Sequence, residues 1–190
     1  MSLLVEIQNA AVEAGDIAVA LRKAKILGSR LNNGDFKRWV DFELNGYPKD
    51  SPLPDYRIIP AIAKGYFNGY GGRALNNAPI PASRLPEKLR DFGRQVYLRQ
   101  GIGTIEATIG RQNETLKSEW PPDLVAMVGR KIYESMSCLS AWQEFPTSAL
   151  VGIVEAARGR LIDFVLEIER ENPDVFHALL TRYALSRPAP

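Results

Sequence analysis

An amphipathic stripe near the carboxyl end of the chain constrains the fold more than any other feature. After Pro146-Thr147-Ser148, apolar residues recur at spacings of three and four, the period of one buried helix face. These residues are Leu150, Ile153, Val154, Ala157, Leu161, Phe164, Val165 and Ile168. The charged side chains fall on the opposite face and include Glu155, Arg158, Asp163 and Glu167. The pattern predicts a long surface helix that buries one side against a core.

The first third of the chain predicts three shorter helices. Asp16 is a candidate cap for a helix whose apolar stripe is Ile17, Leu21, Ala24, Leu27 and Leu31. Asn32-Asn33-Gly34-Asp35 then breaks the chain and offers a cap for the next helix, which Gly46 ends. The apolar face of that helix is Phe36, Trp39, Val40 and Leu44, and Leu4, Ile7 and Ala11 indicate a helix before both. We expect these helices to pack as a small bundle.

Residues 46–86 have a different character, because proline and glycine are dense and the helical period disappears. Tyr56 to Asn68 contains β-compatible segments, and Asn68-Gly69-Tyr70-Gly71-Gly72 is a candidate turn. The segment therefore predicts a small antiparallel hairpin or ribbon.

Helical spacing returns after Pro86 with Leu89, Phe92 and Val96, and we expect Gly101 and Gly103 to interrupt or end this helix. A further helix is expected to open at Trp120-Pro121-Pro122-Asp123, and Asn172-Pro173-Asp174 to precede a terminal one. The expected fold class is α+β and predominantly α-helical. It combines an N-terminal helical bundle, a small β hairpin or ribbon insertion and long C-terminal helices around one core.

Composition limits the class of protein. A chain of 190 residues is long enough for one domain with its own core, and no apolar run is long enough to span a membrane. The net charge of +2 is no signature of nucleic-acid binding, and the basic cluster Arg22-Lys23-x-Lys25 is best interpreted as a solvated helix face. The N-terminus lacks the pattern of a signal peptide, and a single cysteine fits a reducing compartment. We therefore expect a cytoplasmic protein.

No self-contained catalytic motif is present. The only cysteine, Cys138, and the only histidine, His177, form no recognisable nucleophile–base motif and no metal-ligand set. The chain lacks a phosphate-binding P-loop and a Gly-x-Ser-x-Gly elbow, and Gly101-Ile102-Gly103 lacks the third glycine of a dinucleotide turn. Asp41 with Glu43, and Glu167 with Glu169, are too close in sequence to share a helix face. Accordingly we name no catalytic, cofactor-binding or metal-binding residue.

The aromatic-rich middle of the chain suggests two possible binding functions. Tyr56, Arg57, Tyr70 and Arg73 carry groups that stack on bases and bind phosphates, or that anchor protein interfaces. The plainer interpretation is a ribbon whose alternate side chains pack on the helices.

Several ordered motifs resemble the AbiTii family, a domain associated with bacterial abortive infection against phage. They are LRKAKILGSRL at 21–31, FKRWV at 36–40, ELNGYP at 43–48, LPDYR at 53–57, NAPIP at 77–81, WP at 120–121, SALVGI at 148–153 and RGRLIDF at 158–164. The resemblance covers about residues 3–170, so we divide the chain into an AbiTii-like domain at 1–170 and a terminal helix with a loose tail at 171–190. It transfers no catalytic residue. Arg158 and Arg160 join the candidate interaction surface, and Trp39, Leu161 and Phe164 are expected in the core.

The resemblance implies a role in phage defence, and three mechanisms stay open. The leading hypothesis is a sensor, interaction or self-association module that binds a second copy or a protein partner. The alternatives are a growth-arresting enzyme that acts on nucleic acid with magnesium, and a non-enzymatic module that binds nucleic acid.

Overall fold

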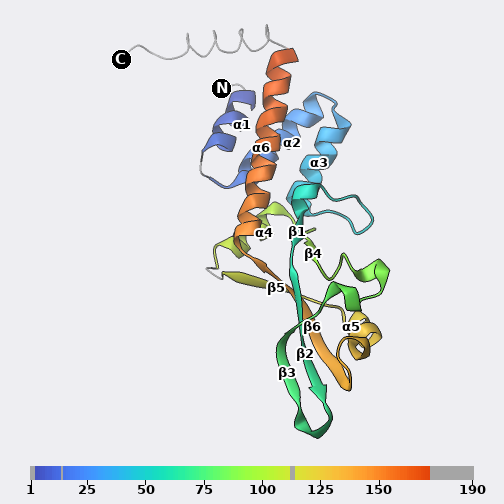
Figure 1. Cartoon of the computed structure of the whole chain (residues 1–190). Helices are drawn as coiled ribbons and strands as arrows, with labels where there is room; N and C mark the ends of the chain where they lie inside the picture. The colour runs from blue at the N-terminus through green and yellow to red at the C-terminus, as the bar shows by residue number, and fades with distance from the viewer. Residues whose placement is uncertain (1–2, 14, 112–113, 172–190) are drawn as a thin grey trace, which may run out of the picture. The chain divides into compact units, whose positions relative to one another are not determined.

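The computed structural model describes residues 3–13, 15–111 and 114–171, which form two compact units (Figure 1). Unit 1 comprises the described residues of 1–52, 99–110 and 151–190, and unit 2 comprises those of 53–98 and 111–150. Six α-helices and two antiparallel sheets lie within these ranges, which confirms the α+β class. Each unit is described below by itself.

Unit 1 is helical. It contains α1 (Leu3–Val12), α2 (Ile17–Arg30), α3 (Gly34–Asn45) and α4 (Ile102–Ile109). It also contains most of α6 (Ser148–Glu171), whose first three residues belong to unit 2. The three N-terminal helices and the long helix after Pro146 are therefore present as predicted.

The helix ends of unit 1 follow from local chemistry. The Asp16 carboxylate accepts a hydrogen bond from the backbone N–H of Ala18 at 2.8 Å, and the Asn33 side chain accepts one from Phe36 at 3.0 Å. Each cap satisfies an amide that has no partner inside its helix. Gly46 ends α3 with φ at 96°, and a β-carbon there would lie 2.8 Å from the carbonyl oxygen of Arg99. Only glycine meets both conditions.

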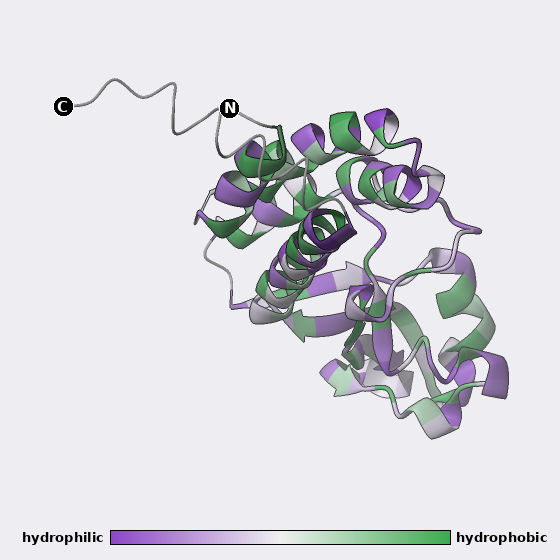
Figure 2. Ribbon diagram, turned by 90° about the horizontal axis from the view of Figure 1, so that it is seen from above, coloured by the Kyte–Doolittle hydropathy of each residue, from purple (hydrophilic) through white to green (hydrophobic). Residues whose placement is uncertain are grey.

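The core of unit 1 is formed mostly by the predicted stripes, but Leu31 of the α2 stripe is 43% exposed, and Ile102 of α4 joins the core from outside the stripes. The residues that are at most 1% exposed include Ile7, Ile17, Leu21, Ala24, Val40, Ile102, Ile153, Ala157, Leu161 and Val165. Figure 2 shows hydrophobic and hydrophilic residues alternating around these helices. Burying each large aliphatic side chain contributes about 1.5–3 kcal/mol, so tertiary packing is what stabilises the short helices.

Unit 2 is built on a four-stranded antiparallel sheet in the order β3-β2-β6-β5. Its strands are β2 (Ile62–Gly69), β3 (Ala74–Pro79), β5 (Thr115–Glu119) and β6 (Met136–Pro146). Two shorter strands, β1 (Ile58–Pro60) and β4 (Gln95–Tyr97), form a separate antiparallel pair. The predicted hairpin is β2–β3, and Gly71 and Gly72 both take positive φ in its turn.

One face of the larger sheet is covered by α5 (Pro122–Val128) and by irregular segments. The buried cluster on that face consists of Ala63, Phe67, Ala78, Ile80, Leu85, Trp120, Val125, Val128, Ile132 and Ala141. Gln143 also points inward and is 1% exposed, and its amide donates to the carbonyl oxygens of Phe92 and Gln95. These bonds connect β6 to the first residue of β4 and to the segment before it.

The prediction of a helix after Pro86 is wrong. Glu87–Leu89 forms a single 3-10 turn, and Val96 lies in β4 opposite Ile59 of β1. Leu89 and Phe92 have helical spacing because both pack against the unit 2 core, not because they share a helix. Gly101 precedes α4 as its N-cap, so it begins a helix instead of ending one.

The terminal helix expected after Asn172-Pro173-Asp174, with His177, lies outside the described residues. Among the helices that are described, none combines the length and the apolar character that crossing a membrane requires. Whether the two units act as the single domain expected for 1–170 stays a prediction.

Candidate functional site

A groove of about 470 Å³ lies between α3 and α6 in unit 1. Eight residues line this α3–α6 groove: Asn33, Asp35, Phe36, Trp39, Arg160, Asp163, Phe164 and Glu167. The α6 members are spaced at i, i+3, i+4 and i+7, so they form one face of the helix beside the buried stripe.

Aromatic rings line part of the groove. Phe36 is 7% exposed and its ring stacks on that of Phe164 with an interplanar angle of 8°. The Trp39 ring is tilted against Phe36, with 5.7 Å between centroids. Trp39 and Phe164 were expected in the core, but both are half-buried and line the groove. Accessible aromatic side chains beside an arginine are typical anchors of protein interfaces.

The charged lining of the groove is predominantly acidic. Asp35, Asp163 and Glu167 contribute three carboxylates, against the single guanidinium of Arg160. Arg38 lies 3.5 Å from the Asp35 carboxylate, but both side chains are largely exposed and such a pair contributes little. The groove therefore favours a partner that presents cations around an apolar group.

The exposed face of α2 has the opposite character. A shallow hollow of about 420 Å³ is lined by Arg22, Lys25, Ile26, Ser29 and Arg30, which we call the α2 patch. Ile26 is 50% exposed at its centre, although isoleucine is normally buried. Lys25 pairs with Asp41 at 2.6 Å, whereas Lys23 pairs with Glu6 on α1 and takes no part in the patch. This face was interpreted from the sequence as merely solvated.

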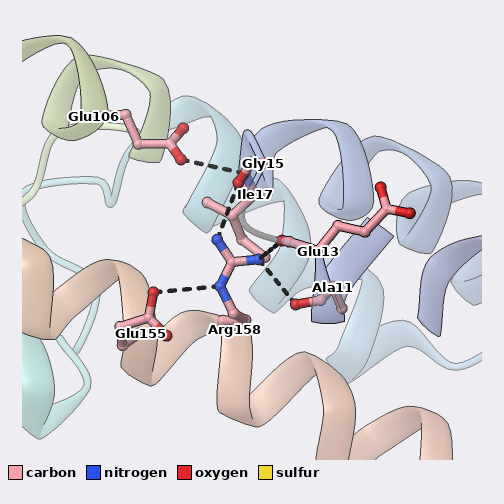
Figure 3. A network of polar contacts seen from close by, with 7 residues as sticks. All are labelled: Ala11, Glu13, Gly15, Ile17, Glu106, Glu155 and Arg158. Atoms are coloured by element: carbon pink, nitrogen blue, oxygen red, sulfur yellow. Dashed lines mark hydrogen bonds and ion pairs between the residues drawn. The ribbon is translucent and has the colours of Figure 1, made fainter. Parts of the chain in front are cut away.

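The side chain of Arg158 is mostly buried and binds backbone groups of neighbouring segments (Figure 3). Its side chain is 13% exposed, and its guanidinium donates to the backbone carbonyl oxygens of Ala11 at 2.9 Å, Glu13 at 3.1 Å and Gly15 at 3.0 Å. It also lies 3.4 Å from the Glu155 carboxylate. Arg158 therefore connects α6 to the end of α1 and to the segment that follows it, which leaves Arg160 as the accessible arginine of the pair.

The carboxyl groups of Asp16 and Glu106 form a pair at the start of α2. The Glu106 carboxylate of α4 accepts a hydrogen bond from the backbone N–H of Ile17 at 3.2 Å (Figure 3). Partial burial, together with the hydrogen bond and the negative charge of Asp16, raises the pKa of Glu106. Arg158 and the Ile17 amide oppose that shift. The pair lies at a helix junction and lines none of the hollows described above.

The candidate residues of unit 2 do not gather at one place. Arg57 is fully buried and donates to the carbonyl oxygen of Leu98 at 3.2 Å, and Tyr56 beside it is half-buried. Tyr70 is 91% exposed and Arg73 is exposed, in the turn at the far end of β2. The eight residues of β2 span about 25 Å at roughly 3.3 Å per residue, so the two pairs are separate.

Three of the four carboxylates that are closely spaced in the sequence, and that would be candidates for holding a metal ion, have other contacts. Asp41 pairs with Lys25, Glu43 is fully buried and accepts a hydrogen bond from the Tyr47 hydroxyl at 2.6 Å, and Glu169 accepts one from Gln8. Within the described part of the chain, no three His, Cys, Asp or Glu residues are placed to hold a metal ion.

The thiol of Cys138 is half-buried, and this burial raises its pKa. A raised pKa leaves less thiolate at neutral pH, and the thiolate is the reactive form.

The model of the AbiTii family matches residues 2–181, which is nearly the whole chain. No curated protein and no solved structure matches it. The chain therefore belongs to the AbiTii family, whose association with abortive infection indicates a role in defence against phage.

Proposed function

We propose that this AbiTii protein acts in phage defence by self-association, in which the α3–α6 groove of one copy binds the α2 patch of another. The observation that carries the proposal is the complementarity of these two surfaces of unit 1. One surface surrounds aromatic rings with three carboxylates, and the other surrounds an exposed Ile26 with three cations.

The chemistry of the contact follows from this pairing. Ile26 enters the groove and packs on the rings of Trp39 and Phe164, which removes apolar surface from water. Arg22 and Arg30 lie one helical turn on either side of Ile26 and meet the acidic lining. Charge pairs of this kind set the orientation and speed of association more than its affinity, so the apolar contact supplies most of the binding free energy.

The geometry of such an assembly is head to tail, because the groove and the patch are different surfaces of the same chain. A contact of this type leaves one free groove and one free patch after each addition, and it produces a ring or a filament. Assembly of this kind depends steeply on concentration. That property suits a defence protein that must stay inactive in an uninfected cell.

A charge-reversal experiment tests the proposal. One variant reverses the groove by Asp163→Lys and Glu167→Lys, and a second reverses the patch by Arg22→Glu and Arg30→Glu. Sedimentation velocity over a concentration series measures association of each variant alone and of an equimolar mixture. We expect wild-type protein to associate, each variant alone to stay monomeric, and the mixture to associate again, because every reversed surface then meets one of opposite charge.

The matched control reverses two exposed cations of unit 1 outside both surfaces, by Lys37→Glu and Lys49→Glu, and should associate like wild type. The proposal fails if wild-type protein is monomeric at every concentration, or if the mixture does not recover association. Monomeric protein that cleaves or binds DNA or RNA would instead favour the toxin or the nucleic-acid-binding hypothesis.

A further inference from the structure

A third hollow, in unit 2, brings together cations that are far apart in the sequence. This basic cleft has a volume of about 430 Å³. Its lining consists of Pro81, Arg84, Arg130, Lys131, Ile132, Tyr133 and Glu134. Arg84 comes from the 3-10 turn Ala82–Arg84, and Arg130 and Lys131 come from the 3-10 turn Gly129–Lys131 that follows α5. Sequence reasoning missed the cleft because 46 positions separate Arg84 from Arg130.

Buried neighbours hold the three cations in place. Leu85, directly after Arg84, is 3% exposed, and Val128 and Ile132, on either side of the dibasic pair, are 1% and 4% exposed. All three belong to one core cluster beneath the sheet. The exposed cations are therefore carried on short backbone segments whose adjacent side chains are fixed in the same core, and the charges converge without help from a ligand.

Close backbone contacts fix the dibasic segment further. A β-carbon on Gly129 would lie 2.7 Å from the β-carbon of Cys138, so this turn packs directly on β6. The Tyr133 hydroxyl donates to the carbonyl oxygen of Pro79 at 2.7 Å, and its ring meets Phe67 edge-on at 4.8 Å. These contacts connect the turn to the end of β3, two residues before Pro81 of the cleft.

The charges of the cleft are not neutralised internally. Arg84, Arg130 and Lys131 form no ion pair with any side chain that the structure describes. Glu134 is the single carboxylate among the lining residues, against three cations. Unit 2 as a whole carries 11 Lys and Arg against 8 Asp and Glu, so the surrounding charge also favours an anion.

We infer that the basic cleft binds a phosphate-bearing ligand. The planar guanidinium forks of Arg84 and Arg130 match phosphate oxygens, and Lys131 adds a point charge. The volume of the basic cleft lies within the range of roughly 300–1,000 Å³ that is typical of small-molecule sites. The Glu134 carboxylate is able to accept a hydrogen bond from a ligand, so a phosphate ester that also carries a hydroxyl or amino donor fits better than a bare anion. Nucleotides and the ends of nucleic-acid strands both have this chemistry.

Isothermal titration calorimetry tests the inference with three probes: inorganic pyrophosphate, adenosine diphosphate and a short oligothymidylate. We expect pyrophosphate and the nucleotide to bind wild-type protein, with the nucleotide binding more tightly. Arg84→Gln and the double change Arg130→Gln with Lys131→Gln should each weaken binding by roughly tenfold or more, because each removes a charge-assisted contact. Arg90→Gln, which changes an exposed arginine of unit 2 outside the cleft, is the matched control and should bind like wild type.

The probes also separate the two sources of phosphate. If the nucleotide binds at least as tightly as the oligonucleotide, the ligand is a small molecule. If the oligonucleotide binds more tightly and its affinity falls steeply with salt, the source is a strand. The inference is overturned if no probe binds, or if the cleft variants bind like wild type while far-UV circular dichroism shows them folded. The cleft lies in unit 2, whereas both surfaces of the proposed self-association lie in unit 1. Sedimentation of the cleft variants therefore measures self-association separately from ligand binding, so failure of one proposal can be told from failure of the other.

Discussion

Replacing Arg158 by alanine tests whether this residue is structural, as its contacts indicate, or part of an interaction surface, as its sequence suggested. The change removes three hydrogen bonds to the carbonyl oxygens of Ala11, Glu13 and Gly15. A hydrogen bond from a charged donor contributes about 1.5–3 kcal/mol when buried. The bonds to Glu13 and Gly15 are solvent-exposed, so water replaces them at little cost. We therefore expect a loss of about 2–3 kcal/mol in the free energy of unfolding, mostly from the partly buried Ala11 carbonyl.

Urea unfolding followed by far-UV circular dichroism measures this loss, and amide hydrogen exchange locates it. Protection should decrease at the end of α1 and the start of α2, where the guanidinium contacts the backbone. Arg158→Lys keeps the charge but cannot reach three carbonyl oxygens at once, so we expect an intermediate stability. Glu155→Ala is the matched control, because it removes only an exposed ion pair and should change stability by less than about 0.5 kcal/mol. Equal effects of Arg158→Ala and Glu155→Ala would refute the structural role.

Three further predictions concern the stability of the two units. Gly152→Ala in α6 should raise the free energy of unfolding by about 0.5–1 kcal/mol, because a β-carbon there meets no atom within 4 Å and alanine favours a helix. Gly129→Ala should lower it by about 1–3 kcal/mol through overlap with Cys138. The raised pKa of Glu106 means that its stabilising contribution is complete below the ordinary value of 4.5 and is lost as pH rises through the folded-state pKa. Glu106→Gln should therefore shift the urea midpoint upward at pH 7 but not at pH 4.

Helices with a long one-sided period could be predicted from the sequence, because each carries its signal locally. The Asp16 and Asn33 caps, the Gly46 stop and the stripe from Leu150 to Val165 all identified their elements in unit 1. Such elements need no information about distant partners, since one apolar face and two end signals define them.

Strand β6, which was not predicted, shows why the sheet was harder to predict from the sequence than the helices. Its inward positions are Ala141, Gln143 and Phe145, so a polar side chain interrupts the apolar alternation. Leu139 has no partner on β2, because the register shifts between Tyr66–Ser140 and Phe67–Cys138. A bulge of this kind moves the side chains that follow it to the other face and hides the period of two. The buried Gln143 is explained only by the carbonyl oxygens that it binds across the fold.

The candidate surfaces could be predicted only in part for the same reason. Arg160 was named as an interaction residue, but the pattern could not distinguish it from Arg158, since the carbonyl oxygens that bury Arg158 lie more than 140 positions away. Trp39 and Phe164 were assigned to the core because an aromatic residue on an apolar face usually lies there. Their half-buried position depends on how α3 and α6 pack, which no local pattern encodes.

If the proposed ligand controls the proposed self-association, ligand binding and assembly must be linked, and the two proposed surfaces lie on different units of the chain. The chain crosses from one unit to the other four times. One of these crossings lies inside a helix, because α6 begins at Ser148 in unit 2 and continues through unit 1. Linkage is reciprocal, so a ligand that promotes self-association must bind the assembled protein more tightly by the same factor. Pyrophosphate affinity should then be higher for wild-type protein than for the variant with the reversed groove. Equal affinities would mean that the cleft and the groove work independently, and that any signal reaches the assembly by another route.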